Sequence, residues 1–256
     1  MIKPPTEHWV QMEESPRRVR VIFAGAAVAD SKQAMLLREA RRLPVYYFPK
    51  RDLRMELLLP TGHTVRCPYK GEASHWTIRV GERAAENAAW SYLHPPPECA
   101  GIRGYMAFEW GKMDRWLEEE EEIFVHARDP YKRVDVLQSS RHVRVLVGGE
   151  TAAETRHPRL LFETNHPTRY YIPREDVKME LLEPSATASR CPYKGAASYW
   201  SVKIGDKLFP DLVWSYQEPI AECPRIKGLL CFFQEREAVI YVDGARVETP
   251  KTNWSR

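Results

Sequence analysis

Alternation between apolar and polar positions runs through most of the chain and predicts β-strands. Residues 19–22 and 143–146 alternate in this way, and each stretch is followed by glycine, a pattern typical of a β-hairpin. Residues 76–80 and 200–204 alternate with the same period of two, as expected of half-buried strands. The pattern therefore predicts a mainly β protein.

The same pattern occurs twice because the chain contains an internal repeat. Residues 46–76 return as residues 170–200 at a constant offset of 124, with 18 of 31 positions identical. Residues 31–42 have a helix-favouring composition, but their second copy contains Pro158 and the strand-favouring residues 160–164. Since equivalent positions share a backbone conformation, both copies are predicted to be extended.

The repeat divides the 256 residues into two domains, each large enough to bury its own core. We predict an N-terminal extension at residues 1–16, a first domain at 17–125, a linker at 126–141 and a second domain at 142–256. The five glutamates at 118–122 are typical of a solvated face or linker. The second domain is predicted to close with a hairpin.

Composition limits the classes of partner. Hydrophobic residues make up 43% of the chain, yet there is no apolar run long enough to span a bilayer. A net charge of +3, from 38 basic and 35 acidic side chains, does not favour nucleic-acid binding. The N-terminus lacks the features of a secretory signal, so a cytoplasmic location is expected. Five cysteines form no dense disulfide framework. The oligomeric state is left open.

Several motifs occur in both halves: Tyr-Tyr-x-Pro followed three residues later by aspartate, then Cys-Pro-Tyr-Lys-Gly, then Trp-Ser-Tyr. A Pro-x-x-x-x-Ile-x-Gly-x-x-x-Phe tail completes the pattern in the first half at residues 97–108. With these motifs the chain resembles the domain of unknown function 427 family in its tandem form, from about residue 17 to 252.

The resemblance implies two antiparallel domains of the β-tent type, a shape shared with methionine sulfoxide reductase B and the thalidomide-binding domain of cereblon. It does not imply their activities. Those relatives usually hold zinc on Cys-x-x-Cys pairs, and this chain contains no Cys-x-x-Cys, so no structural zinc is expected. The family has also carried a nucleotidyltransferase label, but no Gly-Ser followed by paired aspartates is present.

The densest identity between the halves provides the candidate catalytic residues, which are Cys67, Lys70, Cys191 and Lys194. A nearby ammonium can lower the pKa of a thiol and make its thiolate available. Two alternatives stay open: the cysteine is a buried structural residue, or the lysine pairs with a carboxylate from Asp52, Glu56 or their second copies. Cys99 and Cys223 form a second matched pair, but these ligands are too few for a metal site.

Aromatic residues present in both halves are the strongest hint of a binding site. Rings that converge in a β fold can surround a flat or cationic small molecule, although an ordinary aromatic core is the alternative. The candidate ligand-binding residues are Tyr47, Asp52, Tyr69, Trp76, Trp90 and Tyr92 in the first half, and Tyr171, Asp176, Tyr193, Trp200, Trp214 and Tyr216 in the second.

The function indicated by these residues is a module that binds an unknown small molecule and is present twice in the chain. One alternative is an enzyme that uses the Cys/Lys pair for thiol or acyl chemistry. Another is a protein-interaction scaffold that uses exposed edge strands or the acidic run. No cofactor, metal, nucleic acid or membrane is expected as a partner.

Overall fold

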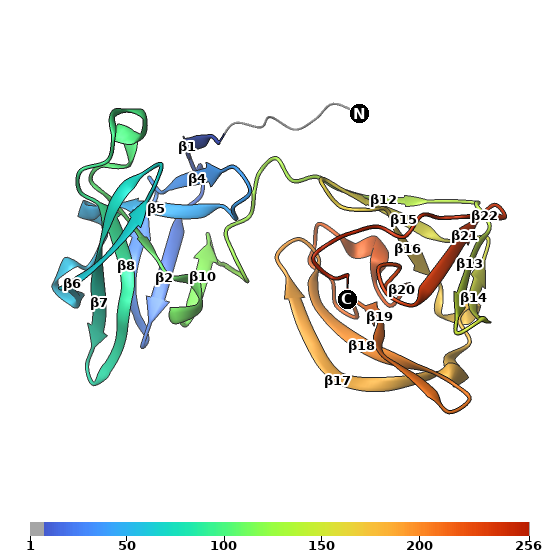
Figure 1. Cartoon of the computed structure of the whole chain (residues 1–256). Helices are drawn as coiled ribbons and strands as arrows, with labels where there is room; N and C mark the ends of the chain where they lie inside the picture. The colour runs from blue at the N-terminus through green and yellow to red at the C-terminus, as the bar shows by residue number, and fades with distance from the viewer. Residues whose placement is uncertain (1–7, 256) are drawn as a thin grey trace. The chain divides into compact units, whose positions relative to one another are not determined.

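The computed structural model of the chain describes residues 8–255, and β-strands form most of it. The chain divides into two compact units, Met1–Asp129 and Pro130–Arg256. Each unit contains a seven-stranded and a four-stranded sheet, and the strands pair in antiparallel fashion (Figure 1). These observations confirm the prediction of two tandem, mainly β domains.

The two sheets of the first domain are built from strands that are mostly neighbours in the sequence. The large sheet contains, in spatial order, β1 (Val10–Glu14), β4 (Met35–Glu39), β5 (Val45–Pro49), β9 (Tyr105–Phe108), β8 (Arg83–Tyr92), β7 (Gly71–Val80) and β6 (Leu58–Cys67). The small sheet contains β11 (Glu121–Ile123), β10 (Arg115–Glu118), β2 (Val19–Phe23) and β3 (Ala26–Ser31).

The second domain repeats this arrangement. Its large sheet contains, in spatial order, β12 (Val134–Gln138), β15 (Arg159–Glu163), β16 (Arg169–Ile172), β20 (Leu230–Phe232), β19 (Lys207–Ser215), β18 (Gly195–Ile204) and β17 (Leu182–Cys191). Its small sheet contains β14 (Glu150–Thr155), β13 (Val143–Val147), β21 (Ala238–Val242) and β22 (Ala245–Arg246).

Short 3-10 helices lie between the strands, most of them at matching places in the two domains. They are η1 (Lys50–Asp52), η2 (Met55–Leu57), η3 (Pro97–Ile102) and η4 (Trp110–Lys112) in the first domain, and η5 (Arg174–Asp176), η6 (Met179–Leu181) and η7 (Pro224–Ile226) in the second. Among the residues from 8 to 255, no helix has the length and apolar composition needed to cross a membrane.

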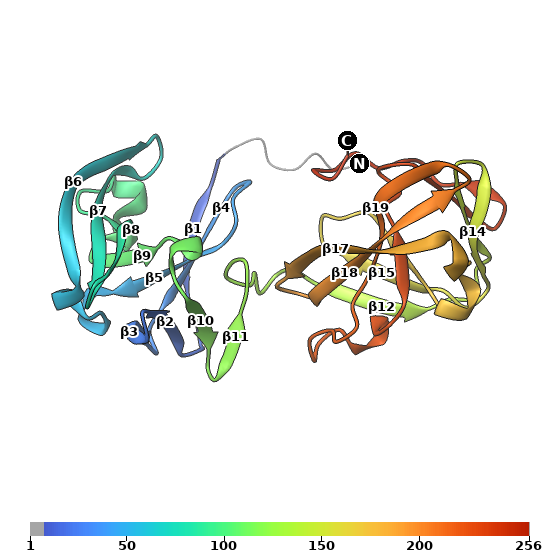
Figure 2. The ribbon, with the colours of Figure 1, turned by 90° about the horizontal axis from the view of Figure 1, so that it is seen from below.

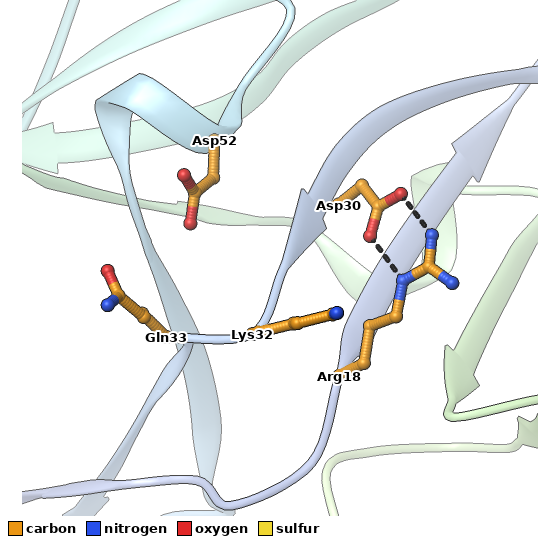
Figure 3. Close-up of a pocket in the computed structure, with 5 residues that line it drawn as sticks. All are labelled: Arg18, Asp30, Lys32, Gln33 and Asp52. Atoms are coloured by element: carbon orange, nitrogen blue, oxygen red, sulfur yellow. Dashed lines mark hydrogen bonds and ion pairs between the residues drawn. The ribbon is translucent and has the colours of Figure 1, made fainter.

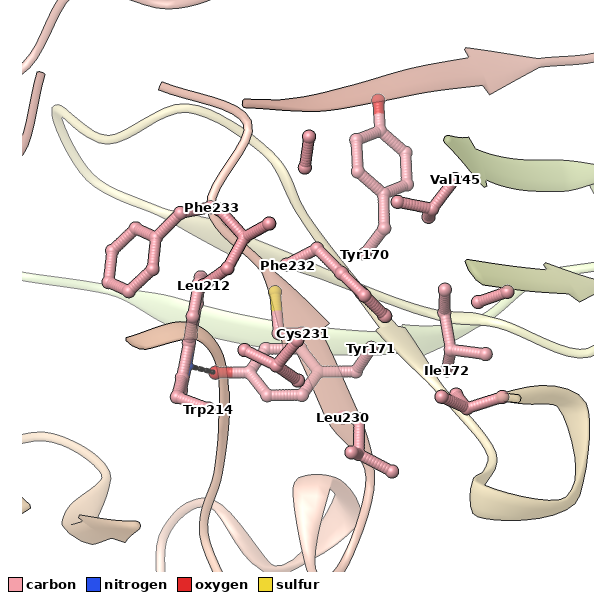
Figure 4. Close-up of a cluster of buried hydrophobic side chains, with 14 of the residues drawn as sticks. Val145, Tyr170, Tyr171, Ile172, Leu212, Trp214, Leu230, Cys231, Phe232 and Phe233 are labelled. Carbon is pink, nitrogen blue, oxygen red and sulfur yellow. Dashed lines mark hydrogen bonds between the residues drawn. The ribbon is translucent and has the colours of Figure 1, made fainter. Parts of the chain in front are cut away.

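Each large sheet buries one face against the small sheet of its own domain. In β5, Tyr46 and Phe48 contact this inter-sheet core together with Val21 of the small sheet. Tyr47, which lies between them, belongs to a separate buried cluster. Because successive side chains of a strand point to opposite faces, Tyr47 lies on the far face of the large sheet, where η3 packs against it. Figure 4 shows the corresponding buried side chains of the second domain.

Two strands lie in segments that we predicted as an extension and a linker. β1 falls within residues 1–16 and pairs with β4, and β12 falls within residues 126–141 and pairs with β15. Each forms an edge of its large sheet. The division between the units at Asp129 and Pro130 therefore lies inside the segment predicted as a linker.

The prediction of a solvated face for the five glutamates holds for residues 119–122, which are exposed, whereas Glu118 is buried and the run forms a hairpin, not a linker. They form the hairpin of β10 and β11 (Figure 2), which closes the first domain as β21 and β22 close the second. The Glu118 side chain is 2% exposed, and its carboxylate accepts hydrogen bonds from Arg17, Arg128 and the Tyr46 hydroxyl. Three donors from distant parts of the sequence compensate the burial of this charge.

Candidate functional site

The face of the large sheet opposite the small sheet carries most of the predicted site residues. In the first domain, Tyr47 of β5, Tyr92 of β8 and Cys99 of η3 form one buried cluster, with Cys67 and Trp90 packed against it. β5 and β8 are both neighbours of β9, so residues distant in the sequence meet on adjoining strands. The cluster therefore brings together predicted residues from four segments of the chain.

The aromatic part of the cluster has the same geometry in both domains. The Trp90 indole donates a hydrogen bond of 3.1 Å to the Tyr47 hydroxyl, and the Trp214 indole donates one of 3.2 Å to Tyr171 (Figure 4). The rings meet edge to face, with centroids 6.4 and 6.3 Å apart. Burial raises the pKa of both tyrosines, so their hydroxyls are protonated at neutral pH.

A buried ion pair lies beside these rings in each domain. The Lys70 ammonium contacts the Glu39 carboxylate at the end of β4, and the Lys194 ammonium contacts Glu163 at the end of β15. The lysines are 7% and 9% exposed. Each lysine is thus paired with a carboxylate, which was one of the alternatives. The prediction that Asp52 or Glu56 provides this carboxylate was wrong.

Each of these ammonium groups has fewer acceptors than donors. An ammonium has three N–H donors, and buried donors in proteins are normally hydrogen-bonded. Among the described residues, Glu39 is the one acceptor for Lys70, and Glu163 is the one acceptor for Lys194. Each buried ammonium therefore uses one of its three N–H donors in a hydrogen bond to an acceptor among the described residues.

The cysteines of the cluster differ in exposure. Cys67 and Cys191, at the ends of β6 and β17, are partly exposed, whereas Cys99 and Cys223 are buried. The Cys99 thiol donates a 3.5 Å hydrogen bond to the backbone carbonyl of Tyr69. Burial raises the pKa of Cys99, and that of Cys223 to about 11, although the nearby lysine opposes this. The two buried thiols are therefore protonated at neutral pH.

A second tyrosine hydroxyl joins the thiol and the glutamate. Burial raises the pKa of Tyr92, and the neighbouring Cys67 and Glu39 raise it further. Burial likewise raises the pKa of Tyr216, with Cys191 as the next cause. The tyrosine hydroxyl thus lies close to the partly exposed thiol and to the glutamate in each domain.

Trp76 and Trp200 do not belong to this cluster. Trp76 is 9% exposed and packs in the inter-sheet core with Ile78, and the Lys50 ammonium lies 5.6 Å from its ring centroid. Trp200 packs against the core of the second domain. These two tryptophans therefore pack with the hydrophobic core, which is the alternative to a binding site given above.

Asp52 and Asp176 lie elsewhere as well. Asp52 accepts a 2.5 Å hydrogen bond from the Ser31 hydroxyl and lines a hollow of about 520 Å³ (Figure 3). Arg18 and Asp30, which also line this hollow, are joined by two hydrogen bonds of 2.7 and 2.6 Å. Asp176 lines a hollow in the second domain. In both domains the aspartate is thus separated from the lysine and the thiols.

Tyr69 and Tyr193 lie at the rim of the cluster, in the turn between cysteine and lysine. The Tyr69 ring is 47% exposed and stacks on His8, with centroids 3.3 Å apart and planes at 9°. The Lys132 ammonium lies 5.5 Å from the Tyr193 ring centroid. These rings therefore contact the chain segment that precedes the first strand of each large sheet.

Sequence reasoning missed Glu39 and Glu163, which complete the cluster. The constant offset of 124 relates them, and it also relates His8 to Lys132. Extending the repeat toward the N-terminus would have identified the glutamates as a matched pair. No group of three or more metal-ligating side chains occurs within residues 8–255.

Comparison with known proteins agrees with the tandem organisation. Residues 11–119 and residues 135–244 each match one family model, which is described as a domain of unknown function (DUF427). The two matches together cover most of the chain and include the cluster in both domains. Among curated proteins, no relative matches this chain.

Proposed function

Since the chain belongs to the DUF427 family through both of its domains, and that family is described as a domain of unknown function, we propose a function from the cluster itself. Each domain binds a small molecule on the far face of its large sheet. The observation that carries this proposal is the buried lysine, which has one protein acceptor for three donors. The ligand therefore carries a hydrogen-bond acceptor that reaches Lys70 or Lys194.

Comparison of the two domains supports a binding role over a purely structural one. The buried charges elsewhere differ: Glu118 pairs with Arg17 and Arg128 in the first domain, whereas Arg169 pairs with Glu235 in the second. The cluster, in contrast, has the indole–tyrosine hydrogen bond and the lysine–glutamate ion pair in both domains. These contacts are retained although the structural ion pairs have diverged between the halves.

The side chains around the lysine indicate the kind of ligand. The rings of Tyr47 and Trp90 provide an apolar border, and Tyr92 and Cys67 provide a hydroxyl and a thiol. Small-molecule sites generally combine apolar and aromatic walls with a few polar groups that fix orientation. A small, partly aromatic or aliphatic molecule with a carbonyl or similar acceptor fits these groups.

A compound screen on the full chain tests the proposal. Compounds that raise the melting temperature of the wild type are expected to bind at least about tenfold more weakly to the Lys70→Met/Lys194→Met variant, because it lacks the ammonium donors. Lys50→Met, which removes an ammonium near Trp76 outside the cluster, is the control. The Trp90→Phe/Trp214→Phe variant keeps an aromatic ring at each position but removes the indole N–H donors. If no compound depends on either pair of residues, the proposal fails.

Thiol chemistry is a second candidate function, favoured by the exposure of one thiol at the same place in each domain. With iodoacetamide at neutral pH, Cys67 and Cys191 are expected to react, whereas the buried Cys99, Cys223 and Cys231 stay unmodified. Peptide mass spectrometry resolves the five sites. Rates above that of a free cysteine derivative would support a nucleophile. Rates at or below it would leave ligand binding as the function.

A further inference from the structure

The glutamate of each cluster has a second basic neighbour, and this neighbour differs between the domains. In the first domain, His8 Nε2 lies 3.0 Å from Glu39 Oε1. In the second domain, Lys132 Nζ lies 3.0 Å from Glu163 Oε1. The two residues are related by the same offset of 124 as the rest of the repeat. One position in the fold therefore holds a histidine in one domain and a lysine in the other.

The two residues also occupy the same place relative to the rim of the cluster. His8 stacks on the Tyr69 ring, and the Lys132 ammonium lies against the Tyr193 ring. Each therefore touches both the glutamate and the tyrosine of the Cys-Pro-Tyr-Lys turn. A change of charge at this position changes the charge of the site itself, not that of a remote surface.

The charge balance of the second domain is positive. Lys194 and Lys132 both form ion pairs with Glu163, and the three side chains are 11%, 18% and 6% exposed. Among the described residues, Glu163 is the one carboxylate within ion-pair distance of either lysine. Burial tends to raise the pKa of Glu163, but Lys194, His166 and Lys132 together outweigh it and lower the pKa, so the carboxylate is ionised. Two ammonium groups thus face one carboxylate.

His166 adds no negative charge to this arrangement. Its Nδ1 lies 3.1 Å from Lys132 Nζ and 3.8 Å from Glu163 Oε1. In the first domain the balance is different, because Lys70 and Glu39 compensate each other and His8 adds charge only when it is protonated. Lys132 therefore gives the second site an ammonium group at the position where the first site has an imidazole.

An excess ammonium charge in a largely desolvated site favours a ligand of opposite charge. We infer that the second domain binds a small anion, with a carboxylate or phosphate group placed against Lys132 and Lys194, and that the first domain binds an uncharged ligand. The inference rests on the proposed function and adds to it the class of ligand. Residue 132 and its counterpart, residue 8, determine whether the domain binds an anion or an uncharged ligand.

Nuclear magnetic resonance of the full chain, labelled with ¹⁵N, tests this inference. Sodium acetate and sodium phosphate are titrated separately at constant ionic strength, with sodium chloride as the reference. The backbone amides of Lys194 and Gly195 report on the second site, and those of Lys70 and Gly71 report on the first in the same sample. Saturable shifts are expected in the second domain, with affinity at least about tenfold higher than in the first. The two anions distinguish a carboxylate from a phosphate site.

Two reciprocal variants complete the test. Lys132→His is expected to abolish the anion response of the second domain, and His8→Lys to create one in the first. The gain in His8→Lys cannot arise from misfolding. Equal shifts in both domains, or shifts that persist in Lys132→His, would overturn the inference.

The outcome also separates this inference from the proposed function. If uncharged compounds from the screen shift the Lys194 and Gly195 amides and neither anion does, the binding site stands but its anion preference is wrong. If neither anions nor screened compounds shift the amides of either domain, both are wrong.

Discussion

Replacement of Glu235 by glutamine is expected to destabilise the second domain by about 3–5 kcal/mol, the usual cost of breaking a buried ion pair from one side. The Arg169 guanidinium donates two hydrogen bonds to the Glu235 carboxylate, and the side chains are 9% and 0% exposed. Glu235 also accepts a 3.0 Å hydrogen bond from the Thr252 hydroxyl. Without the carboxylate charge, the guanidinium remains buried and uncompensated.

Hydrogen exchange followed by mass spectrometry measures this effect for each domain separately. Exchange in β13 reports on the second domain, and exchange in β2 is the internal reference. Glu218→Gln is the matched control, because its pair with Lys227 is exposed and contributes less than about 1 kcal/mol. A double variant, Arg169→Met/Glu235→Leu, is expected to recover much of the loss, since an apolar pair can replace a buried ion pair. Equal effects of Glu235→Gln and Glu218→Gln would contradict the prediction.

Much of the fold could be predicted because local patterns and the repeat agree with the final structure. The alternation at residues 76–80 corresponds to β7, and that at 19–22 to β2. Residues 31–42 show the value of the repeat: their composition favours a helix, yet they contain β4. Pairing with β1 and β5 overrides the intrinsic preference in this segment, and the second copy revealed it.

What could not be predicted depends on contacts between distant residues. Glu118 is buried only because Arg17, Tyr46 and Arg128 surround it, and no local pattern contains that information. For the same reason the partner of Lys70 was sought at Asp52, which is nearer in sequence. The fold brings the end of β4 to the lysine although β4 and the turn between β6 and β7 lie near opposite ends of the strand order, whereas Asp52 in η1 lines a separate hollow.

The site was predictable to the extent that its residues repeat. Tyr47, Trp90 and Tyr92 pack with Cys67 in one cluster, whereas Trp76 repeats equally well but packs in the core between the sheets. Repetition selects residues that both domains need, for packing as well as for binding. The face of the sheet to which a side chain points separates the two classes, and this face depends on register.

Gly195 lies in the turn that positions Lys194. Its replacement by alanine is expected to destabilise the second domain by about 2–4 kcal/mol. Gly195 has φ of +107°, a conformation that residues with a Cβ rarely adopt. An added Cβ would also lie 3.2 Å from both the Glu218 carbonyl oxygen and the Ile220 nitrogen, which are backbone atoms. Because Ile220 donates a 3.1 Å hydrogen bond to the Lys194 carbonyl, the lysine and this loop would shift together.

Alanine substitutions of two other glycines distinguish the cost of backbone strain from the cost of steric crowding by the added Cβ. Gly228 also has positive φ, at +70°, but a Cβ there would meet nothing within 4 Å, so Gly228→Ala is expected to cost only about 1–2 kcal/mol. Gly71→Ala should lie between the two, since its nearest contact would be 3.4 Å. Chemical denaturation checks the order, and iodoacetamide labelling of Cys223 reports on the loop beside Gly195, because a displaced loop exposes that thiol. If Gly195→Ala costs no more than Gly228→Ala and leaves Cys223 protected, the close approach does not hold the turn, and the lysine is positioned by its ion pair alone.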